Sequence, residues 1–350
     1  AFARCGNPSS VHRFGRDARR VLEAARAQVA ALVDAPPSDI IFTSGGTEAN
    51  NLALAGCGRA RLLVSAIEHG SVLEAAPLAE RIPVDGDGIV ALDALERKLA
   101  ADPRPALVSV MLANNETGVI EPVAAVAERA HRMGALLHCD AVQAAGKIPL
   151  DGRALGADLL TLSAHKLGGP PGIGALVVLR ELDLMPQIRG GGQERGRRAG
   201  SENLPGIAGF AAAAAAAAAG IAAYDDVRRL RDELERAIAA LAPGAVIVGA
   251  AAPRLPNTAA IAMPGTPAET QVIALDLDGV MVSAGAACSS GKVRASHVLE
   301  AMGAGPELAG STIRVSLGWS TTETDVARFL AAWAALYRRR RNLAEGMRAA

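Results

Sequence analysis

Short apolar runs alternate with helical segments over the first two thirds of the chain, and this alternation constrains the fold more than any other feature. Five such runs occupy residues 39–44, 61–66, 106–112, 135–140 and 157–163. Apolar strands separated by helices are typical of a parallel sheet with crossover helices. Residues 174–180 follow a Pro-Gly turn, and we expect them to add an antiparallel strand.

The pattern changes after an Ala-rich stretch, Leu204 to Tyr224. Three further apolar runs, at residues 258–264, 279–285 and 311–318, predict strands of a smaller α+β domain. Ser320 and Glu323 predict a capping box at the start of a closing helix, Thr322 to about Leu343. We therefore predict an α/β fold in two domains. A large domain with a mostly parallel sheet flanked by helices takes residues 10–240, and a smaller C-terminal α+β domain takes residues 241–350 with residues 1–9.

Composition excludes several classes of protein. Lys plus Arg equals Asp plus Glu, 36 each, which argues against a general nucleic-acid binder. The Ala-rich stretch is long enough to span a bilayer, but it contains a proline and three glycines. We interpret it as a packed helix of a soluble protein and expect no membrane partner. The four cysteines form no C-x-x-C pair, which fits a reducing compartment and predicts a cytoplasmic protein without a resident metal.

Polar, chemically capable residues follow the ends of the predicted strands. They are Gly45-Gly46-Thr47, Glu68-His69, Asn114-Asn115, Asp140 with Gln143, and Ser163 with His165 and Lys166. Ligands of open α/β sheets bind beyond the carboxyl ends of the strands, so we expect these groups to share one site. The Gly-Gly-Thr turn at a helix start predicts a phosphate cradle.

These groups together match the needs of pyridoxal phosphate. The aldehyde of that cofactor requires a lysine amine, its ring nitrogen requires an anionic partner, and its ring requires a flat group to stack on. Lys166, Asp140 and His69 would fill these three roles.

At this point the sequence resembles a known family. Its motifs are, in order, SGGTEANNLA, EHGSV, NNETGVI, HCDAVQAAGK, SAHKLGGPPGIGAL, GGGQERGRRAGSEN, SAGAACSSG and STIRVSLG. They are similar to the successive motifs of the NifS/IscS-like cysteine desulfurases, which belong to the class V aminotransferase group of fold-type I pyridoxal phosphate enzymes. The resemblance runs from Gly6 to about Thr322, nearly the whole chain.

The resemblance implies a role for each matching residue at the cofactor. Lys166 would form the Schiff base, and His69 would stack on the ring. Ser201 stands where the family commonly has Thr and would reach the phosphate from the other subunit, which implies a homodimer. The remaining implied cofactor contacts are Gly46, Thr47, Asn115, Asp140, Gln143, Ser163 and His165.

The resemblance also implies a second catalytic centre at Cys288. In the family the matching cysteine attacks the sulfur of cofactor-bound L-cysteine, alanine leaves, and the enzyme keeps a persulfide. The sulfur would pass to an iron–sulfur scaffold or another acceptor protein, and Cys288 would serve as a transient iron–sulfur ligand at most. Arg314, with Asn115, would bind the substrate carboxylate, because the planar fork of arginine pairs with both oxygens.

Three other functions stay open at this stage. The chain could be a selenocysteine lyase or a related class V aminotransferase, although a plain aminotransferase needs no thiol at Cys288. It could also be an inactive cofactor-binding partner, because the chain opens inside the family pattern, without the Asn-Ala-Thr-Thr turn that precedes it in relatives. The motifs do not specify the sulfur acceptor, nor a nitrogenase-related or a housekeeping role.

Overall fold

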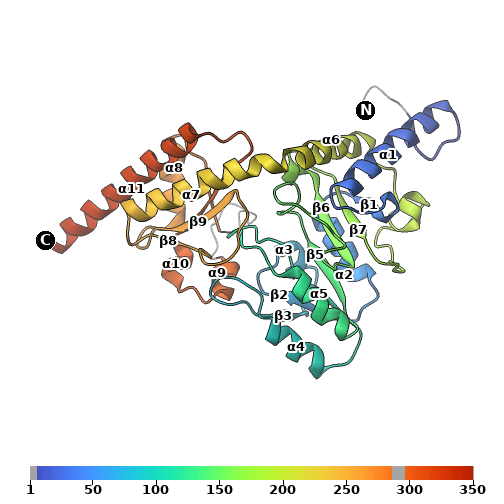
Figure 1. Ribbon diagram of the computed structural model, residues 1–350, viewed down its shortest axis with the longest axis horizontal. Coiled ribbons are helices and arrows are strands. Elements are labelled where there is room, and N and C mark those ends of the chain that lie inside the picture. The colour runs from blue at the N-terminus through green and yellow to red at the C-terminus, as the bar shows by residue number, and fades with distance from the viewer. Residues whose placement is uncertain (1–5, 286–295, 350) are drawn as a thin grey trace. The chain divides into compact units, whose positions relative to one another are not determined.

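The computed structural model describes residues 6–285 and 296–349, with side chains described as far as residue 342. The chain divides into two compact units. Unit 1 comprises Ala1–Pro83, Val90–Ala113 and Glu121–Ile221; unit 2 comprises Val84–Ile89, Asn114–Ile120 and Ala222–Ala350. Figure 1 shows the helices and strands of both units.

This division differs from the predicted domains in three ways. The boundary falls near residue 221 and not at residue 240, and residues 6–9 count with unit 1. Two short segments of the predicted large domain also belong to unit 2. Hydrogen bonds explain one of them, since Leu255 N donates to Gly118 O at 2.7 Å and Ile120 N donates to Pro253 O at 2.8 Å. Such long-range pairing leaves no periodic signal in the sequence.

Unit 1 contains a seven-stranded sheet in the order β1-β7-β6-β5-β4-β2-β3. Its strands are β1 (Ile40–Thr43), β2 (Arg61–Ser65), β3 (Glu80–Ile82), β4 (Ala106–Ser109), β5 (Leu136–Asp140), β6 (Leu159–Ser163) and β7 (Gly174–Val178). Strands β2 to β6 pair in parallel, and β7 pairs antiparallel with both β1 and β6. The predicted mostly parallel sheet and its antiparallel addition are both confirmed.

Helices flank this sheet. They are α1 (Arg13–Ala31), α2 (Gly46–Gly56), α3 (Gly70–Leu73), α4 (Leu92–Ala101), α5 (Val123–Arg132) and α6 (Leu204–Gly220). Helix α2 packs on β5, β6 and β7, while α5 packs on β5 with α4 beside it. Every residue of β1, β4, β5, β6 and β7 is buried, which explains why these strands read as continuous apolar runs.

The Ala-rich stretch forms α6 and, after a short 3-10 turn at Ile221–Ala223, leads into α7 (Tyr224–Leu241). By length and composition alone, the 38 residues Leu204–Leu241 could cross a membrane, with a mean hydropathy of 1.8 in the most apolar window. Helix α6 packs on α1, and Ile207 and Phe210 on it are fully buried. One face of α6 is therefore part of the core of unit 1.

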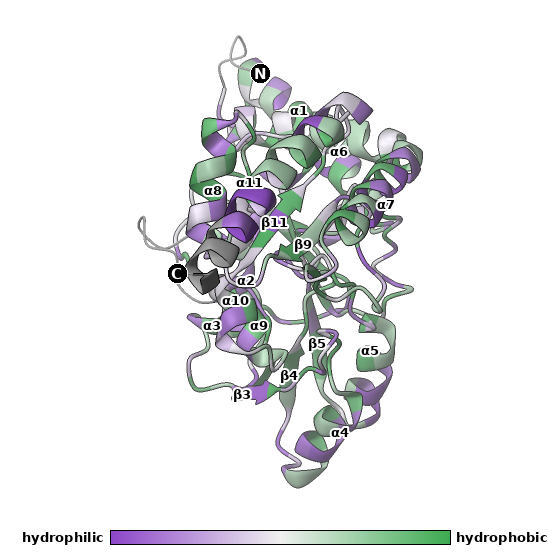
Figure 2. Cartoon of the chain, turned by 90° about the vertical axis from the view of Figure 1, so that its left-hand side faces the viewer, coloured by the Kyte–Doolittle hydropathy of each residue, from purple (hydrophilic) through white to green (hydrophobic). Residues whose placement is uncertain are grey.

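Unit 2 contains an antiparallel four-stranded sheet in the order β10-β11-β9-β8. Its strands are β8 (Val246–Ile247), β9 (Thr258–Ala262), β10 (Ser283–Ala284) and β11 (Thr312–Ser316), and its helices besides α7 are α8 (Ala268–Leu277), α9 (His297–Ala301), α10 (Pro306–Gly310) and α11 (Glu323–Ala349). In Figure 2, β9 is green, the hydrophobic end of the scale, whereas α7 alternates purple and green.

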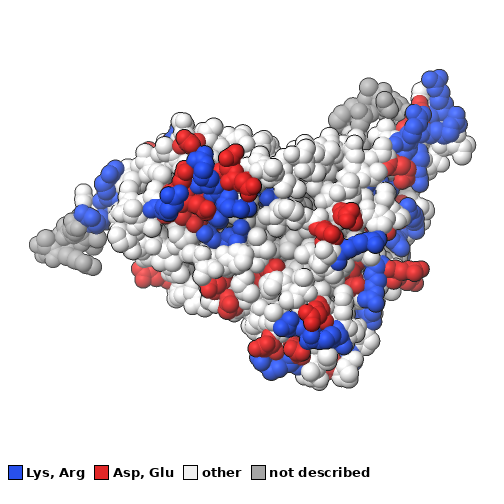
Figure 3. Space-filling view, viewed as in Figure 1, with Lys and Arg blue, Asp and Glu red and all other residues white. Residues whose placement is uncertain are grey.

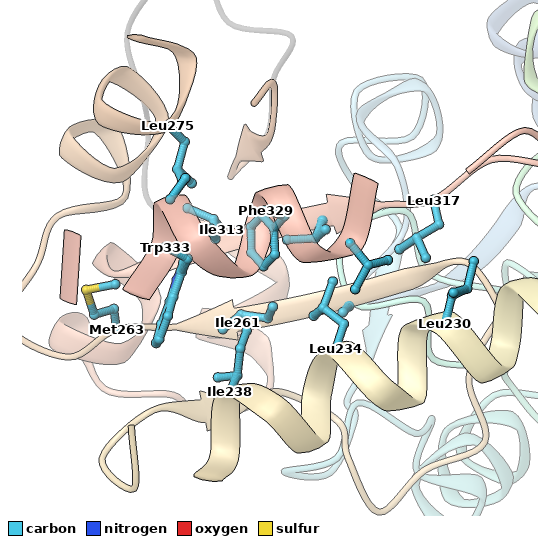
Figure 4. Packing of buried hydrophobic residues seen from close by; sticks show 14 of the residues in the cluster. Leu230, Leu234, Ile238, Ile261, Met263, Leu275, Ile313, Leu317, Phe329 and Trp333 are labelled. Atoms are coloured by element: carbon cyan, nitrogen blue, oxygen red, sulfur yellow. The ribbon is translucent and has the colours of Figure 1, made fainter. Parts of the chain in front are cut away.

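The apolar face of α7 explains that alternation. Leu230, Leu234 and Ile238 point from α7 toward Ile261 on β9, and Trp333 on α11 closes the same core (Figure 4). The side chains of Met263, Leu234 and Trp333 in this cluster are almost fully buried. The smaller α+β domain therefore has a hydrophobic core of its own.

The capping box of α11 differs from the predicted one. Thr322 N donates to Asp325 Oδ2 at 2.8 Å, and Asp325 N donates to Thr322 Oγ1 at 3.3 Å. Glu323 instead accepts from Arg229 at 3.1 Å. Thr322 and not Ser320 is therefore the capping residue of this helix, which begins at Glu323.

Charged side chains of both signs are interspersed on the face drawn in Figure 3. On α7, for example, Arg229 pairs with Glu233 at 2.9 Å, and Glu235 pairs with Arg254 at 2.6 Å.

Candidate active site

The site of unit 1 lies at the carboxyl edge of its sheet. Strands β2, β4, β5 and β6 are parallel, so the residues that follow them reach the same edge. Helix α2 begins there at Gly46, directly after β1. The amides of its first turn have no intrahelical acceptor and can bind an anion. A Cβ on Gly46 would lie 3.1 Å from Val142 Cγ2, so glycine allows the helix start to approach this edge closely.

A chain of hydrogen bonds connects His69 to Asp140. His69 precedes α3, and its Nδ1 lies 2.8 Å from Ser71 Oγ. Asn50 of α2 donates from Nδ2 to Ser71 Oγ and to Asp140 Oδ2, both at 2.8 Å. Val142 N donates to the other carboxylate oxygen, Oδ1, at 2.9 Å. Three segments far apart in sequence are therefore fixed around one carboxylate.

The same contacts determine the tautomer of His69. Ser71 N donates to His69 Nδ1 at 3.1 Å, so that nitrogen is an acceptor and carries no proton. The neutral ring then carries its proton on Nε2. The imidazole is held in one orientation, as a ring that stacks on a ligand needs to be.

Asp140 combines burial with specific donors. It is 6% exposed, and burial raises its pKa above the usual value. The hydrogen bonds from Asn50 and Val142 lower the pKa, as does the charge of Lys166. A carboxylate in this position gains from a cationic group on a ligand, because that charge offsets the cost of its burial.

A second acid lies near Asp140. Glu68 is fully buried at the end of β2 and accepts from Met111 N at 2.6 Å. Burial, followed by the charge of Asp140, raises the pKa of Glu68 well above its usual value. Burial therefore favours the neutral form of Glu68, whereas Asp140 has two donors that favour its anion.

Behind Asp140, His138 connects three strands. Its Nδ1 lies 2.9 Å from Ser109 Oγ on β4, and its Nε2 lies 3.0 Å from Thr161 Oγ1 on β6. Burial lowers the pKa of His138 to about 3, so the ring is neutral. His138 and Asp140 are two residues apart on β5, so their side chains lie on the same face of the sheet. The hydrogen bonds of His138 to Ser109 and Thr161 therefore hold the strand that carries Asp140.

Lys166 lies on the 3-10 turn Ala164–Leu167 that follows β6. The residue is exposed. Ser163 Oγ lies 2.9 Å from His165 Nδ1 on the same turn. Burial, then the charges of Lys166 and Lys147, lower the pKa of His165 and keep its ring neutral. This turn presents an amine, a hydroxyl and an imidazole at the edge where Asp140 lies.

Three predicted cofactor contacts have less defined surroundings. Thr47 is exposed in the first turn of α2, and Gln143 is half-buried three residues after Asp140. Ser201 is exposed and lines a cavity of about 220 Å³ together with Ser44 and Arg198 of the same chain. The predicted contact of Ser201 with another subunit stays a prediction.

Unit 2 holds the remaining predicted residues. Arg314 on β11 donates from Nη1 to Asn115 O at 2.8 Å and from Nη2 to Ser283 Oγ at 3.1 Å. Asn115 Oδ1 is buried and has no partner among the described residues. The structure thus brings Arg314 and Asn115 together, and their shared role at the substrate stays a prediction. Arg314 and Asn115 both belong to unit 2, and the other described site residues belong to unit 1.

The cysteines differ in what the structure says of them. Cys288, the predicted nucleophile, lies outside the described residues. Cys57 and Cys139 are buried free thiols, and burial raises the pKa of both. A buried, protonated thiol is a poor nucleophile, so neither competes with Cys288 for that role.

The residues of unit 1 fit pyridoxal phosphate on the chemistry of the donor set. Lys166 supplies the amine, Asp140 supplies a buried anion held by the neutral donors of Asn50 and Val142, and His69 supplies an oriented ring. The free amides of α2, with Ser163 and His165, supply donors for a phosphate. Sequence reasoning missed two members of this set, Asn50 and Ser71. Neither residue had a sequence signal, because the contact of Asn50 with Ser71 and Asp140 joins separate segments of the chain.

Comparisons with known proteins agree with this geometry. The aminotransferase class-V family model matches residues 3–329. The cysteine desulfurase of Cereibacter sphaeroides is 45% identical over 339 residues, covering 93% of this chain and 87% of that protein. A NifS-like protein from Rickettsia africae ESF-5 superposes with a TM-score of 0.89 at 38% identity, covering 96% of this chain and 93% of that one. A structure of SspA in complex with cysteine superposes with a TM-score of 0.77 at 28% identity, covering 90% and 91%. The chain therefore belongs to the class-V aminotransferase family and, within it, to the cysteine desulfurases.

Proposed function

We propose that this enzyme takes sulfur from L-cysteine with pyridoxal phosphate bound in unit 1 and Cys288 as the sulfur acceptor. The observation that carries the proposal is the Asp140–Asn50–Ser71–His69 chain of hydrogen bonds at the same sheet edge as Lys166. Asp140 supplies an anion, His69 supplies an oriented ring and Lys166 supplies an amine. Each of these residues lies at or after the end of a different strand. The related SspA was solved in complex with cysteine, which supports the choice of substrate.

Each group of the chain has a separate task in this proposal. When bound, the cofactor supplies an electron sink that makes the Cα–H bond of the substrate acidic. Asp140 holds a proton on the ring nitrogen, because a nearby anion favours the charged form. Lys166 Nζ would hold the cofactor and would accept the Cα proton of the substrate. Arg314 binds the substrate carboxylate through a planar fork, with Asn115 beside it.

The sulfur step balances without an external oxidant. The thiolate of Cys288 attacks the sulfur of the substrate, an S–S bond forms, and the Cβ–S bond breaks. The carbon keeps the bonding electron pair and gains a proton, so alanine is released and the enzyme carries one extra sulfur as a persulfide. An acceptor protein thiol then removes that sulfur.

The test is alanine formation from L-cysteine by wild type, Cys288→Ser and Cys57→Ser. We expect wild type and Cys57→Ser to form alanine at similar rates, and Cys288→Ser to form almost none. Alkylation followed by peptide mass spectrometry should find the extra sulfur on Cys288. Alanine formation by Cys288→Ser at the parent rate would refute the proposed role of that residue. Alanine from selenocysteine alone would favour a lyase, and transfer of an amino group to an oxo acid would favour an aminotransferase.

Three further parts of the proposal concern the setting of the enzyme. A homodimer would let Ser201 complete the phosphate site of the partner, which its exposure permits. Light scattering that finds a fully active monomer would overturn this. An iron–sulfur scaffold or another sulfur carrier would be the acceptor, and the cytoplasm would be the location, where the free thiols of Cys57 and Cys139 persist. Transfer of radioactive sulfur and cell fractionation test these two parts.

A further inference from the structure

A buried ion pair that the proposed chemistry does not use joins α1 to the segment 188–203, which lies between β7 and α6. Arg26 of α1 donates from Nη1 to Glu194 Oε2 and from Nη2 to Glu194 Oε1, both at 2.8 Å. Phe42 N of β1 donates to Glu194 Oε2 at 2.9 Å. Both side chains of the pair are buried. The carboxylate of Glu194 therefore fastens this segment to two elements of unit 1.

The backbone at Glu194 has an unusual conformation. Glu194 and Arg195 have φ values of 44° and 57°, in the left-handed region that residues with a Cβ rarely adopt, and Gly196 follows with 76°. Adjacent non-glycine residues persist in this region only where their surroundings enforce it, and such strain clusters at functional sites. The pair with Arg26, and a hydrogen bond from Arg195 Nη1 to Ser38 O, supply that constraint.

The strained turn leads to the start of α2, where the free amides lie. Arg198 donates from Nε to Glu48 Oε1 at 2.8 Å and from Nη2 to Glu48 Oε2 at 3.2 Å, and Glu48 belongs to the first turn of α2. Asn203 is the N-cap of α6. Ser201 lies between these two anchors and is exposed. The place of its hydroxyl therefore depends on how the segment is held.

We propose that Glu194 is a positioning residue, which fixes the segment 188–203 against α1 and β1 so that Ser201 is presented to the phosphate of the cofactor. A ligand that binds through a mobile loop must order that loop, and the lost entropy weakens binding. A loop that is already anchored avoids this loss. The phosphate contact of Ser201 rests on the function proposed above, but the anchoring by Glu194 does not.

The first experiment measures the anchoring in the apoprotein, by hydrogen exchange of peptides from the segment 188–203. Ala199 N donates to Ile188 O at 3.0 Å, so the exchange of this amide reports whether the segment keeps its conformation. Glu194→Gln has the same shape but turns a donor toward the N–H groups of Arg26. Exchange of the Ala199 amide should become faster by roughly tenfold or more.

The second experiment separates the phosphate from the rest of the cofactor. Absorbance titrations of the apoprotein give its affinity for pyridoxal 5′-phosphate and for pyridoxal, which has no phosphate. Glu194→Gln should lower the ratio of the two affinities by roughly tenfold, because only the phosphorylated ligand uses Ser201. Ser201→Ala should lower the ratio similarly, and it should have little further effect when combined with Glu194→Gln.

Two other variants make the test decisive. Arg61→Met is the matched control, because it breaks another buried pair, with Glu80 Oε1 at 2.8 Å, at the first residue of β2 and thus at the opposite edge of the sheet. It should change neither the exchange of Ala199 nor the affinity ratio. Arg26→Lys keeps a positive charge beside Glu194 but loses the planar fork. It replaces Glu194→Gln if that variant does not fold, and it should change both measurements in the same direction by a few-fold, roughly.

Unchanged exchange in Glu194→Gln and Arg26→Lys would overturn the proposal, as would equal effects of Arg61→Met. Faster exchange with an unchanged affinity ratio would overturn the role of Glu194 at the phosphate. A wild-type protein that binds both ligands equally, with exchange that still responds to Glu194→Gln, would refute the phosphate site of the proposed function and leave the anchoring in place.

Discussion

Asn50 makes the most specific structural prediction, because one amide donates to both Ser71 and Asp140. Asn50→Ala removes the donor 2.8 Å from Asp140 Oδ2 without touching the carboxylate itself. A hydrogen bond to a charged group contributes about 1.5–3 kcal/mol, and one pKa unit corresponds to about 1.4 kcal/mol. The pKa of Asp140, which burial already raises, should therefore rise by a further one to two units, roughly.

The sign of the effect on stability follows from linkage. A carboxyl group whose pKa is higher in the folded than in the unfolded state binds its proton more tightly when folded. Its contribution to stability is present at low pH and is lost as the pH rises through the folded-state pKa. The destabilisation by Asn50→Ala should therefore grow with pH, by about 1.5–3 kcal/mol between about pH 4 and about pH 9. The cavity left by the side chain adds a part that does not depend on pH.

Urea unfolding of the apoprotein over this pH range provides the assay, since no ligand then acts on Asp140. The control is Asn51→Ala, which removes the neighbouring, exposed asparagine whose Nδ2 donates to Thr47 O at 2.8 Å. Its effect on the free energy of unfolding should be small and independent of pH. If the cost of Asn50→Ala is also flat with pH, the assignment of Asp140 as the anion stabilised by Asn50 is wrong.

Three other outcomes follow from buried groups. Burial lowers the pKa of His138 to about 3, so unfolding takes up a proton below about pH 6.5. His138→Gln should therefore reduce the loss of stability on acidification by up to ~1.4 kcal/mol per pH unit. An unchanged dependence of the unfolding free energy on pH, measured in urea, would contradict this. Arg26→Met leaves the carboxylate of Glu194 buried without its bidentate partner and should lower the free energy of unfolding by about 3–5 kcal/mol. Arg20→Met, on the exposed face of the same helix, should lower it by less than ~0.5 kcal/mol. Equal losses of stability in calorimetry would refute this difference. Burial raises the pKa of Cys139, so iodoacetamide should label it only after unfolding, and rapid labelling of the native protein would show that the thiol is accessible.

The predicted strands of unit 1 were confirmed where they are buried on both faces. Residues 39–44 and 157–163 are examples, and they became β1 and β6. The short strands β3 and β8 were missed, because two or three residues carry no period that distinguishes a strand from a loop. The capping residues of α11 were also misplaced, since Ser320 and Thr322 both precede an acid by three residues and only the start of the helix decides between them.

The sequence by itself determined which chemical groups the enzyme presents. His69, Asp140 and Lys166 each follow an apolar run, and parallel strands carry whatever follows them to one edge of a sheet. Only the tertiary structure decided how these groups are held. The side-chain amide that donates to Asp140 comes from Asn50, ninety residues away in sequence. One acceptor of Arg314 is the carbonyl of Asn115, at a separation of 199. Such contacts arise from the packing of helices on sheets and have no local period, so no pattern along the chain could have specified them.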